Sequence, residues 1–191
     1  MSSIPSISIE ALEAYWSSVT KVGKPTQLAR YEAAGAPEPI LKIIRLGGGP
    51  AMGTRMEKIA RHVFKGDLLP RAKGATGHDH RIYVGEKTLL IEQKSAGLWS
   101  ETANDYKWQH IEVDHKWDFL LLAGIQYNGI DFWAMSRANF LRAVESGLAT
   151  NQGNKAKESS EGIWMTYINV SSLLTPIKTK ADLVAFAAAL A

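Results

Sequence analysis

The chain of 191 residues contains no cysteine. This absence excludes a disulfide framework and a cysteine-ligated zinc site, and it agrees with a reducing cytoplasm. The first ten residues, MSSIPSISIE, lack the basic and apolar regions of a secretion signal. No apolar run reaches the roughly 18 residues needed to span a bilayer. We therefore expect a soluble, cytoplasmic protein that does not enter a membrane.

Positive charge is in only small excess, because the formal net charge is +3 and the isoelectric point is about 9.0. Such a balance permits binding to nucleic acid without requiring it. A chain of this length is the size of one domain and buries roughly 70% of its unfolded surface. We therefore expect a single domain over residues 1–191, with a mobile polar loop at about 150–162.

Hydrophobic periodicity and turn signals predict alternating helices and strands. The apolar run 118–125 is the strongest signal for a buried strand, and Asn128-Gly129 predicts a hairpin to the next strand. Ser136 is expected to cap a helix that ends at Gly147. Further helices are predicted at 8–22, 26–34, 51–64, within 101–111 and at 180–190, with a last strand at 163–170.

A second hairpin lies in the stretch 77–96, GHDHRIYVGEKTLLIEQKSA. Its polar VGEK segment favours a type II′ turn with Gly85 and Glu86 as the central residues. Pairing would then continue outward from Val84 and Lys87, so that Asp79 lies opposite Glu92.

Strand alternation places Glu92 and Lys94 on one face of this hairpin and Gln93 on the other, buried face. Opposed carboxylates on paired strands repel each other unless a positive charge lies between them. A divalent cation supplies that charge, and Mg²⁺ prefers oxygen ligands. Lys94 is placed to orient or deprotonate an attacking water, or to neutralise charge that develops on a phosphate.

Asp79 followed by Glu92-Gln93-Lys94 resembles the motif of the PD-(D/E)xK nucleases, with His78 in the position of the proline. The family includes type II restriction endonucleases, junction resolvases and repair nucleases. The resemblance implies an α/β, restriction-endonuclease-like fold with a mixed central sheet flanked by helices and the site at one edge of the sheet. It further implies Asp79, Glu92 and the Gln93 carbonyl as metal ligands.

On this resemblance we expect a compact type II restriction endonuclease. It would hydrolyse double-stranded DNA with Mg²⁺, for which Mn²⁺ would substitute, and Lys94 would position or activate water. A homodimer is expected, because a double-strand break at a palindrome needs two sites related by a two-fold axis.

Glu57 is a further candidate for the site. It lies in the predicted helix 51–64, and nucleases of this family commonly supply a glutamate from the helix that precedes the motif. Thr54 and Glu57 also have the spacing of a capping box, in which the glutamate binds the backbone N–H of the capping residue. The sequence leaves both interpretations open.

Polar side chains near the hairpin and after the second hairpin are candidates for DNA contacts. Three tryptophans between 99 and 117 have a composition compatible with a substrate-facing segment, although tryptophan is more often a core residue. The candidate DNA contacts are Arg55, Arg71, Lys73, His80, Arg137 and Asn139.

Four alternatives stay open. The hairpin can be a solvated surface element, or histidines can form a zinc or other transition-metal cluster around Asp79. The protein can also be a structure-selective nuclease, or a DNA-binding or partner-binding module without catalysis. The histidines concerned are His78, His80, His110 and His115.

Overall fold

The computed structural model of the chain describes residues 26–47, 49–99, 105–152 and 162–191. Among these residues, no helix is long and apolar enough to cross a membrane. The elements are α2 (Gln27–Ala33), α3 (Glu38–Ile44), α4 (Pro50–Val63), β1 (Leu69–Pro70), β2 (His80–Val84), β3 (Lys87–Gly97), β4 (Lys107–Ile111), β5 (Phe119–Ile125), β6 (Ile130–Ser136), α5 (Arg137–Glu145), β7 (Ala149–Asn151), β8 (Ile163–Thr166), α6 (Tyr167–Val170), a 3₁₀ turn (Ser171–Leu173), β9 (Thr175–Pro176) and α7 (Lys180–Ala188).

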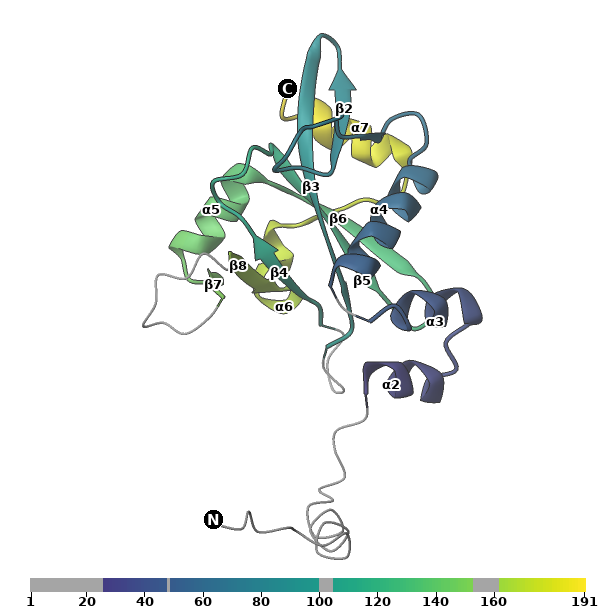
Figure 1. Ribbon diagram of the computed structural model, residues 1–191. Helices are drawn as coiled ribbons and strands as arrows, with labels where there is room; N and C mark the ends of the chain where they lie inside the picture. Colours follow the sequence, from purple (N-terminus) through teal and green to yellow (C-terminus); the bar gives the residue numbers. More distant parts are fainter. Residues whose placement is uncertain (1–25, 48, 100–104, 153–161) are drawn as a thin grey trace, which may run out of the picture.

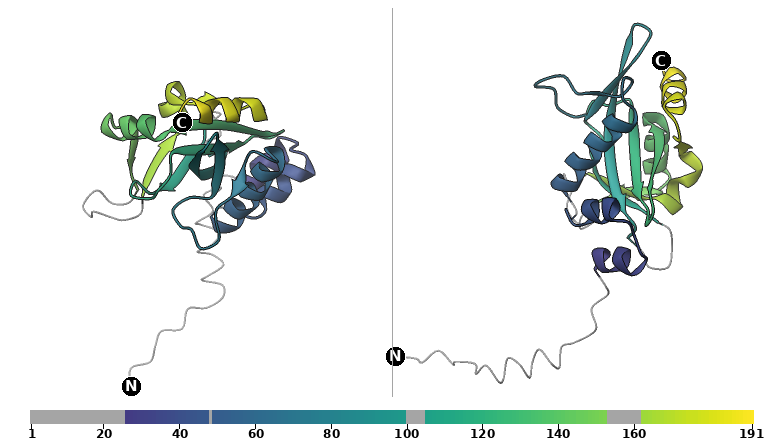
Figure 2. Two further views of the ribbon diagram at one scale, coloured as in Figure 1. Left: turned by 90° about the horizontal axis from the view of Figure 1, so that it is seen from above. Right: turned by 90° about the vertical axis from the view of Figure 1, so that its right-hand side faces the viewer.

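The described residues form a mixed central sheet with the strand order β1-β2-β3-β5-β6-β9, and a smaller sheet with the order β4-β8-β7 (Figure 1). Strands β3 and β5 are parallel, whereas the other neighbours in both sheets are antiparallel. In Figure 2, α4 lies on one side of the central sheet and α5 and α7 lie on the other. The predicted α/β class, with a mixed central sheet flanked by helices, is confirmed.

Strand β5 is the centre of the core, because each of its seven residues is buried. It continues into β6 through the predicted turn, where the Gln126 N–H donates to the Gly129 carbonyl at 2.8 Å. The smaller sheet packs against this strand: the Trp108 indole donates to the Ala123 carbonyl at 3.0 Å. A side chain at Gly124 would collide with the Tyr106 ring, whose nearest atom lies 2.5 Å from the Cβ position.

Most predicted helices form where local signals placed them. Thr26 caps α2, and Gly35 follows that helix with a φ of 70°. Ser136 caps α5 by accepting a hydrogen bond from the Asn139 N–H at 3.2 Å, and Gly147 follows this helix with a φ of 74°. Helix α7 agrees with the expected terminal helix at 180–190.

Two expectations are wrong. Residues Lys107–Ile111, within the range where a helix was expected, form strand β4, and Trp108 is buried in the core. The strand expected at 163–170 ends at Thr166, whose side chain caps α6 by accepting from the Asn169 N–H. Strand β3 lies inside the sheet, but within β3 the residues from Glu92 onward pair with β5 alone. The predicted helix at 8–22 and most of the expected loop, 153–161, lie outside the described residues.

Candidate functional site

The hairpin of β2 and β3 has the predicted register. Val84 pairs with Lys87 and His80 pairs with Ile91, so the same register places Asp79 opposite Glu92. Gly85 has a φ of 59° and Glu86 does not share this left-handed conformation, as a type II′ turn requires. A two-residue turn and a two-residue side-chain period are sufficient to fix which side chains meet.

Asp79 is held at the start of β2 by bonds to β3. Its N–H donates to the Ile91 carbonyl at 2.9 Å, and its Oδ2 accepts from the Gln93 N–H at 2.8 Å. The aspartate is therefore fixed next to the Glu92-Gln93 peptide.

Glu92 and Lys94 form a close ion pair, with 2.7 Å between Oε1 and Nζ. The Glu92 side chain is only 9% exposed and the Lys94 side chain is 20% exposed. The two residues are two positions apart on β3, and their pairing offsets the free-energy cost of burying the two charges. A solvated surface hairpin does not have this arrangement, so the surface interpretation of Glu92 is wrong.

Glu57 comes to the site from the middle of α4. The helix begins at Pro50, and Thr54 lies within it, so Thr54 is not a capping residue and the capping-box interpretation is wrong. The Glu57 carboxylate lies 3.5 Å from the Arg61 guanidinium, one helical turn further along. Its place is set by the helix face that packs on β3.

Burial and the Asp79 carboxylate both raise the pKa of two nearby glutamates, Glu57 and Glu92. Burial raises the pKa of the Glu57 carboxyl, and the Asp79 carboxylate raises it further, while Arg61 acts in the opposite direction. Burial also raises the pKa of Glu92; Lys94 lowers it, and Asp79 raises it again. Two glutamates on different elements are thus destabilised as anions by the same aspartate, which a bound cation would relieve.

These side chains line one cleft of about 720 Å³. The cleft is bounded by residues of α4, β3 and β4, and Glu57, Asp79, Glu92, Gln93 and Lys94 all contribute to its surface. Groups separated by up to 37 positions in the sequence therefore share one space that a substrate can enter.

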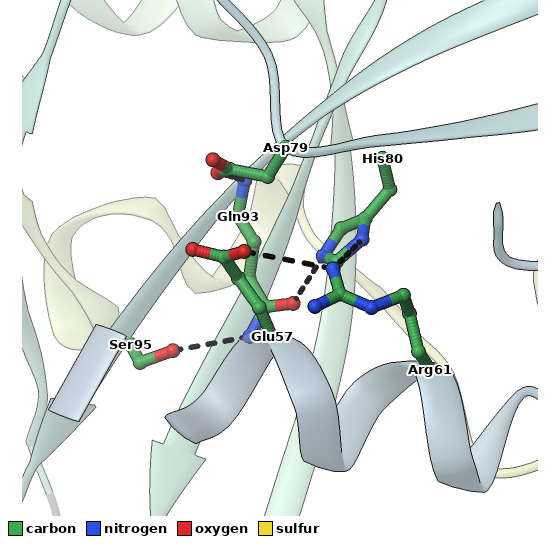
Figure 3. A network of polar contacts seen from close by, with 6 residues as sticks. All are labelled: Glu57, Arg61, Asp79, His80, Gln93 and Ser95. Atoms are coloured by element: carbon green, nitrogen blue, oxygen red, sulfur yellow. Dashed lines mark hydrogen bonds and ion pairs between the residues drawn. The ribbon is translucent and has the colours of Figure 1, made fainter. Parts of the chain in front are cut away.

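A series of polar contacts, partly buried, connects Arg61 through His80 and Gln93 to Ser95 beside the site (Figure 3). The Arg61 guanidinium donates to His80 Nδ1 at 3.1 Å, and His80 Nε2 lies 2.8 Å from Gln93 Oε1. The Gln93 amide in turn donates to Ser95 Oγ at 3.3 Å. Because Nδ1 accepts from a guanidinium, His80 is neutral with its proton on Nε2.

The environment of His80 agrees with that tautomer. The ring is fully buried, and burial lowers its pKa from 6.5 to about 4, with the Arg61 charge acting in the same direction. The sequence suggested His80 as a DNA contact; a ring that solvent does not reach makes no such contact, and the expectation is wrong. His80 instead orients Gln93 and Arg61.

Within the described ranges, no three histidine, aspartate or glutamate side chains form a group that could hold a metal ion, so the histidine cluster is not supported. The carboxylates of Asp79 and Glu92 and the Gln93 carbonyl offer oxygen ligands, which are the type that a hard cation takes. Mg²⁺ is commonly bound through one or two carboxylates and keeps several waters. Asp79 and Glu92, with the Gln93 carbonyl, are the residues that would hold it.

The other predicted DNA contacts fall into two groups. Arg55, Arg71 and Lys73 are exposed, and the charge of Arg71 lowers the pKa of Glu57, so Arg71 lies near the site. DNA contact by these three residues stays a prediction.

Arg137 and Asn139 do not line the cleft, and their polar groups are used within the protein. Asn139 Nδ2 donates to the Leu173 carbonyl at 3.1 Å. The Arg137 guanidinium stacks on Trp117 at 4.6 Å and donates to the carbonyls of Val113, His115 and Trp117.

The cleft is also lined by Trp99 and by Lys107, Gln109 and His110 of β4. Sequence reasoning included Trp99 only in a tryptophan-containing segment and His110 only as a possible zinc ligand, and it did not single out Lys107 or Gln109. His110 has a φ of 56°, a conformation uncommon for a residue with a side chain, and it lies at the irregularity in the β4 and β8 pairing. An alternating polar pattern in 107–110 was the available signal, but it was assigned to a helix.

Comparison with protein-family models gave no match, and a search of curated proteins gave none either. The resemblance to nucleases therefore rests on the hairpin residues and on the geometry of the cleft.

Proposed function

We propose that the protein is a Mg²⁺-dependent endonuclease that hydrolyses phosphodiester bonds in double-stranded DNA. The observation that carries the proposal is the meeting of Glu57, Asp79, Glu92 and Lys94 in one cleft. The raised pKa values of both glutamates indicate a site that favours a cation.

The reaction forms a bond from a water oxygen to phosphorus and breaks a bridging P–O bond, and the leaving oxygen takes up a proton. A bound Mg²⁺ would supply Lewis-acid stabilisation of the phosphate charge. Asp79 and Glu92 would hold the cation. Lys94 orients the water or neutralises the phosphate, and Glu57, with its raised pKa, accepts a proton from the water.

The finer proposal is a type II restriction endonuclease that acts as a homodimer. The second candidate, a structure-selective nuclease, is favoured by the exposed indole of Trp99, which lines the cleft. Plasmid and phage DNA separate the two candidates. A restriction enzyme cuts linear duplex into discrete fragments, whereas a structure-selective enzyme cuts branched or unpaired junctions.

The experiment is incubation of DNA with Mg²⁺, Mn²⁺, Ca²⁺ or EDTA. Cleavage is expected with the first two ions only, and Asp79→Ala, Glu92→Ala and Lys94→Ala should abolish it. Glu145→Gln is the matched control, because Glu145 is exposed at the end of α5 and does not line the cleft. Undiminished cleavage in EDTA would refute the proposal, as would equal activity of the wild type and Asp79→Ala.

A further inference from the structure

Trp99 is a large aromatic residue that is left uncovered at the cleft. It is 52% exposed, whereas Trp108 and Trp117, from the same stretch of sequence, are in the core at 0% and 3%. Trp99 lies two residues beyond the end of β3 and shares the cleft with Lys94 and Glu92. Burying the ring would stabilise the fold, so the exposure of this indole beside a polar site calls for a functional explanation.

The indole is held in a fixed position by Asp105. Trp99 Nε1 donates to Asp105 Oδ2 at 3.1 Å, and the Trp99 N–H donates to the Asp105 carbonyl at 3.2 Å. Asp105 is itself buried, and its Oδ1 accepts from the N–H groups of Tyr106 and Ile168, each at 3.0 Å. The ring is therefore anchored at its edge while much of its surface stays open.

Lys107 adds a positive charge next to this ring. Its ammonium lies 5.5 Å from the centre of the Trp99 ring and 4.3 Å from that of Trp164. Among the described residues it has no carboxylate partner. Aromatic rings that stack on bases, combined with cations that follow the backbone, are how proteins bind single-stranded nucleic acid.

We propose that Trp99 and Lys107 form a subsite for an unpaired nucleotide, with the base on the indole and a phosphate on the ammonium. The inference rests on the proposed nuclease function and favours its second candidate, a structure-selective nuclease, whose substrate is duplex DNA that carries unpaired nucleotides. Trp99 lies five positions after Lys94 on extended backbone, roughly 16 Å between Cα atoms, so the unpaired nucleotide lies a short distance along the strand from the reacting phosphate. Bases inside an uninterrupted duplex are stacked on each other and do not reach the indole.

The test compares binding of two DNAs of the same sequence in Ca²⁺, which does not support cleavage. One DNA is a plain duplex, and the other carries a short unpaired flap containing 2-aminopurine, a base whose fluorescence falls on stacking. Wild-type protein should bind the flap DNA more tightly and quench its fluorescence. Trp99→Ala should weaken this binding about 5- to 150-fold and remove the quenching, with plain duplex binding unchanged.

Three variants keep the test decisive. Trp99→Phe retains a ring and should restore most of the flap binding. Such recovery would show that the loss in Trp99→Ala comes from the missing ring and not from misfolding. Tyr83→Ala removes an aromatic residue that is 53% exposed but lies outside the cleft, and it should bind as the wild type does. Lys107→Met should weaken flap binding and reduce its salt dependence.

Equal binding of both DNAs by the wild type, or unchanged flap binding in Trp99→Ala, would overturn the inference. Metal-dependent cleavage of plain duplex would then still support the proposed function. Conversely, absence of cleavage with Mg²⁺ and Mn²⁺ on every DNA would refute the nuclease proposal, while the fluorescence measurement would still decide the subsite.

Discussion

Replacement of His80 by glutamine tests the series of polar contacts beside the site. The ring accepts from Arg61 at 3.1 Å and approaches Gln93 Oε1 at 2.8 Å. A glutamine amide offers the same pair of functions, an acceptor oxygen and a donor nitrogen, but it does not titrate. His80→Gln should therefore fold at neutral pH while removing the effect of acid on this position.

The magnitude follows from the lowered pKa of His80. The unfolded chain takes up a proton on this imidazole below pH 6.5, whereas the folded protein does so only near pH 4. Stability is therefore lost as the pH falls from 6.5 toward 4, because the unfolded state binds more protons in this window. At pH 5 the loss from this residue is about 2 kcal/mol for a pKa of about 4.

The assay is urea unfolding at pH 7.5 and pH 5.0, followed by tryptophan fluorescence. Glu57 and Glu92, whose pKa values are raised, act in the opposite direction in this range, so the comparison is between variants. The fall in unfolding free energy should be smaller by about 2 kcal/mol in His80→Gln than in the wild type. His62→Gln, at an exposed position of α4, should keep the wild-type fall. An equal fall in wild type and His80→Gln would refute a buried neutral imidazole.

Three further predictions concern the site and the assembly. Glu57→Gln should reduce cleavage by about 10²-fold or more with an unchanged melting temperature, since Glu57 is not a helix cap; wild-type cleavage would remove it from the mechanism. Cleavage should decline in acid as the pH falls through the raised pKa values of Glu57 and Glu92. In the same test, Lys94→Met should shift the protonation of Glu92, followed by infrared spectroscopy, to higher pH, and an unchanged Glu92 titration would contradict the ion pair. Light scattering with DNA should give a homodimer mass, and a monomer mass would count against the two-site arrangement.

The hairpin could be predicted from sequence because its determinants are local. Gly85 sets the turn, and the two-residue period then carries the pairing to Asp79 and Glu92. The place of Glu57 on a core-facing helix was also readable from apolar spacing, whereas the capping interpretation failed because Pro50 begins the helix four positions before Thr54.

The remaining features depend on contacts between distant segments. Trp108 becomes part of a strand because the Ala123 carbonyl and the core receive its indole, and no signal within 101–111 specifies this partner. The neutral state of His80 depends on its burial and on a hydrogen bond from Arg61 of α4, so it could not be inferred from strand alternation. Trp99 stays exposed, unlike Trp108 and Trp117, and its indole is anchored by Asp105.

The parallel pairing of β3 with β5 has a consequence for the order of folding. The β2 and β3 hairpin joins near neighbours in the chain, whereas the register of Ile91 with Phe119 requires closure of a much longer loop. We expect the acidic and basic groups of the hairpin to meet before the walls of the cleft exist. Gly85→Ala, which strains a turn residue at a φ of 59°, should then slow refolding in stopped-flow experiments; a change confined to the unfolding rate would place hairpin formation late. The charged centre would thus be assembled early, at a stage when water still screens the repulsion between its carboxylates.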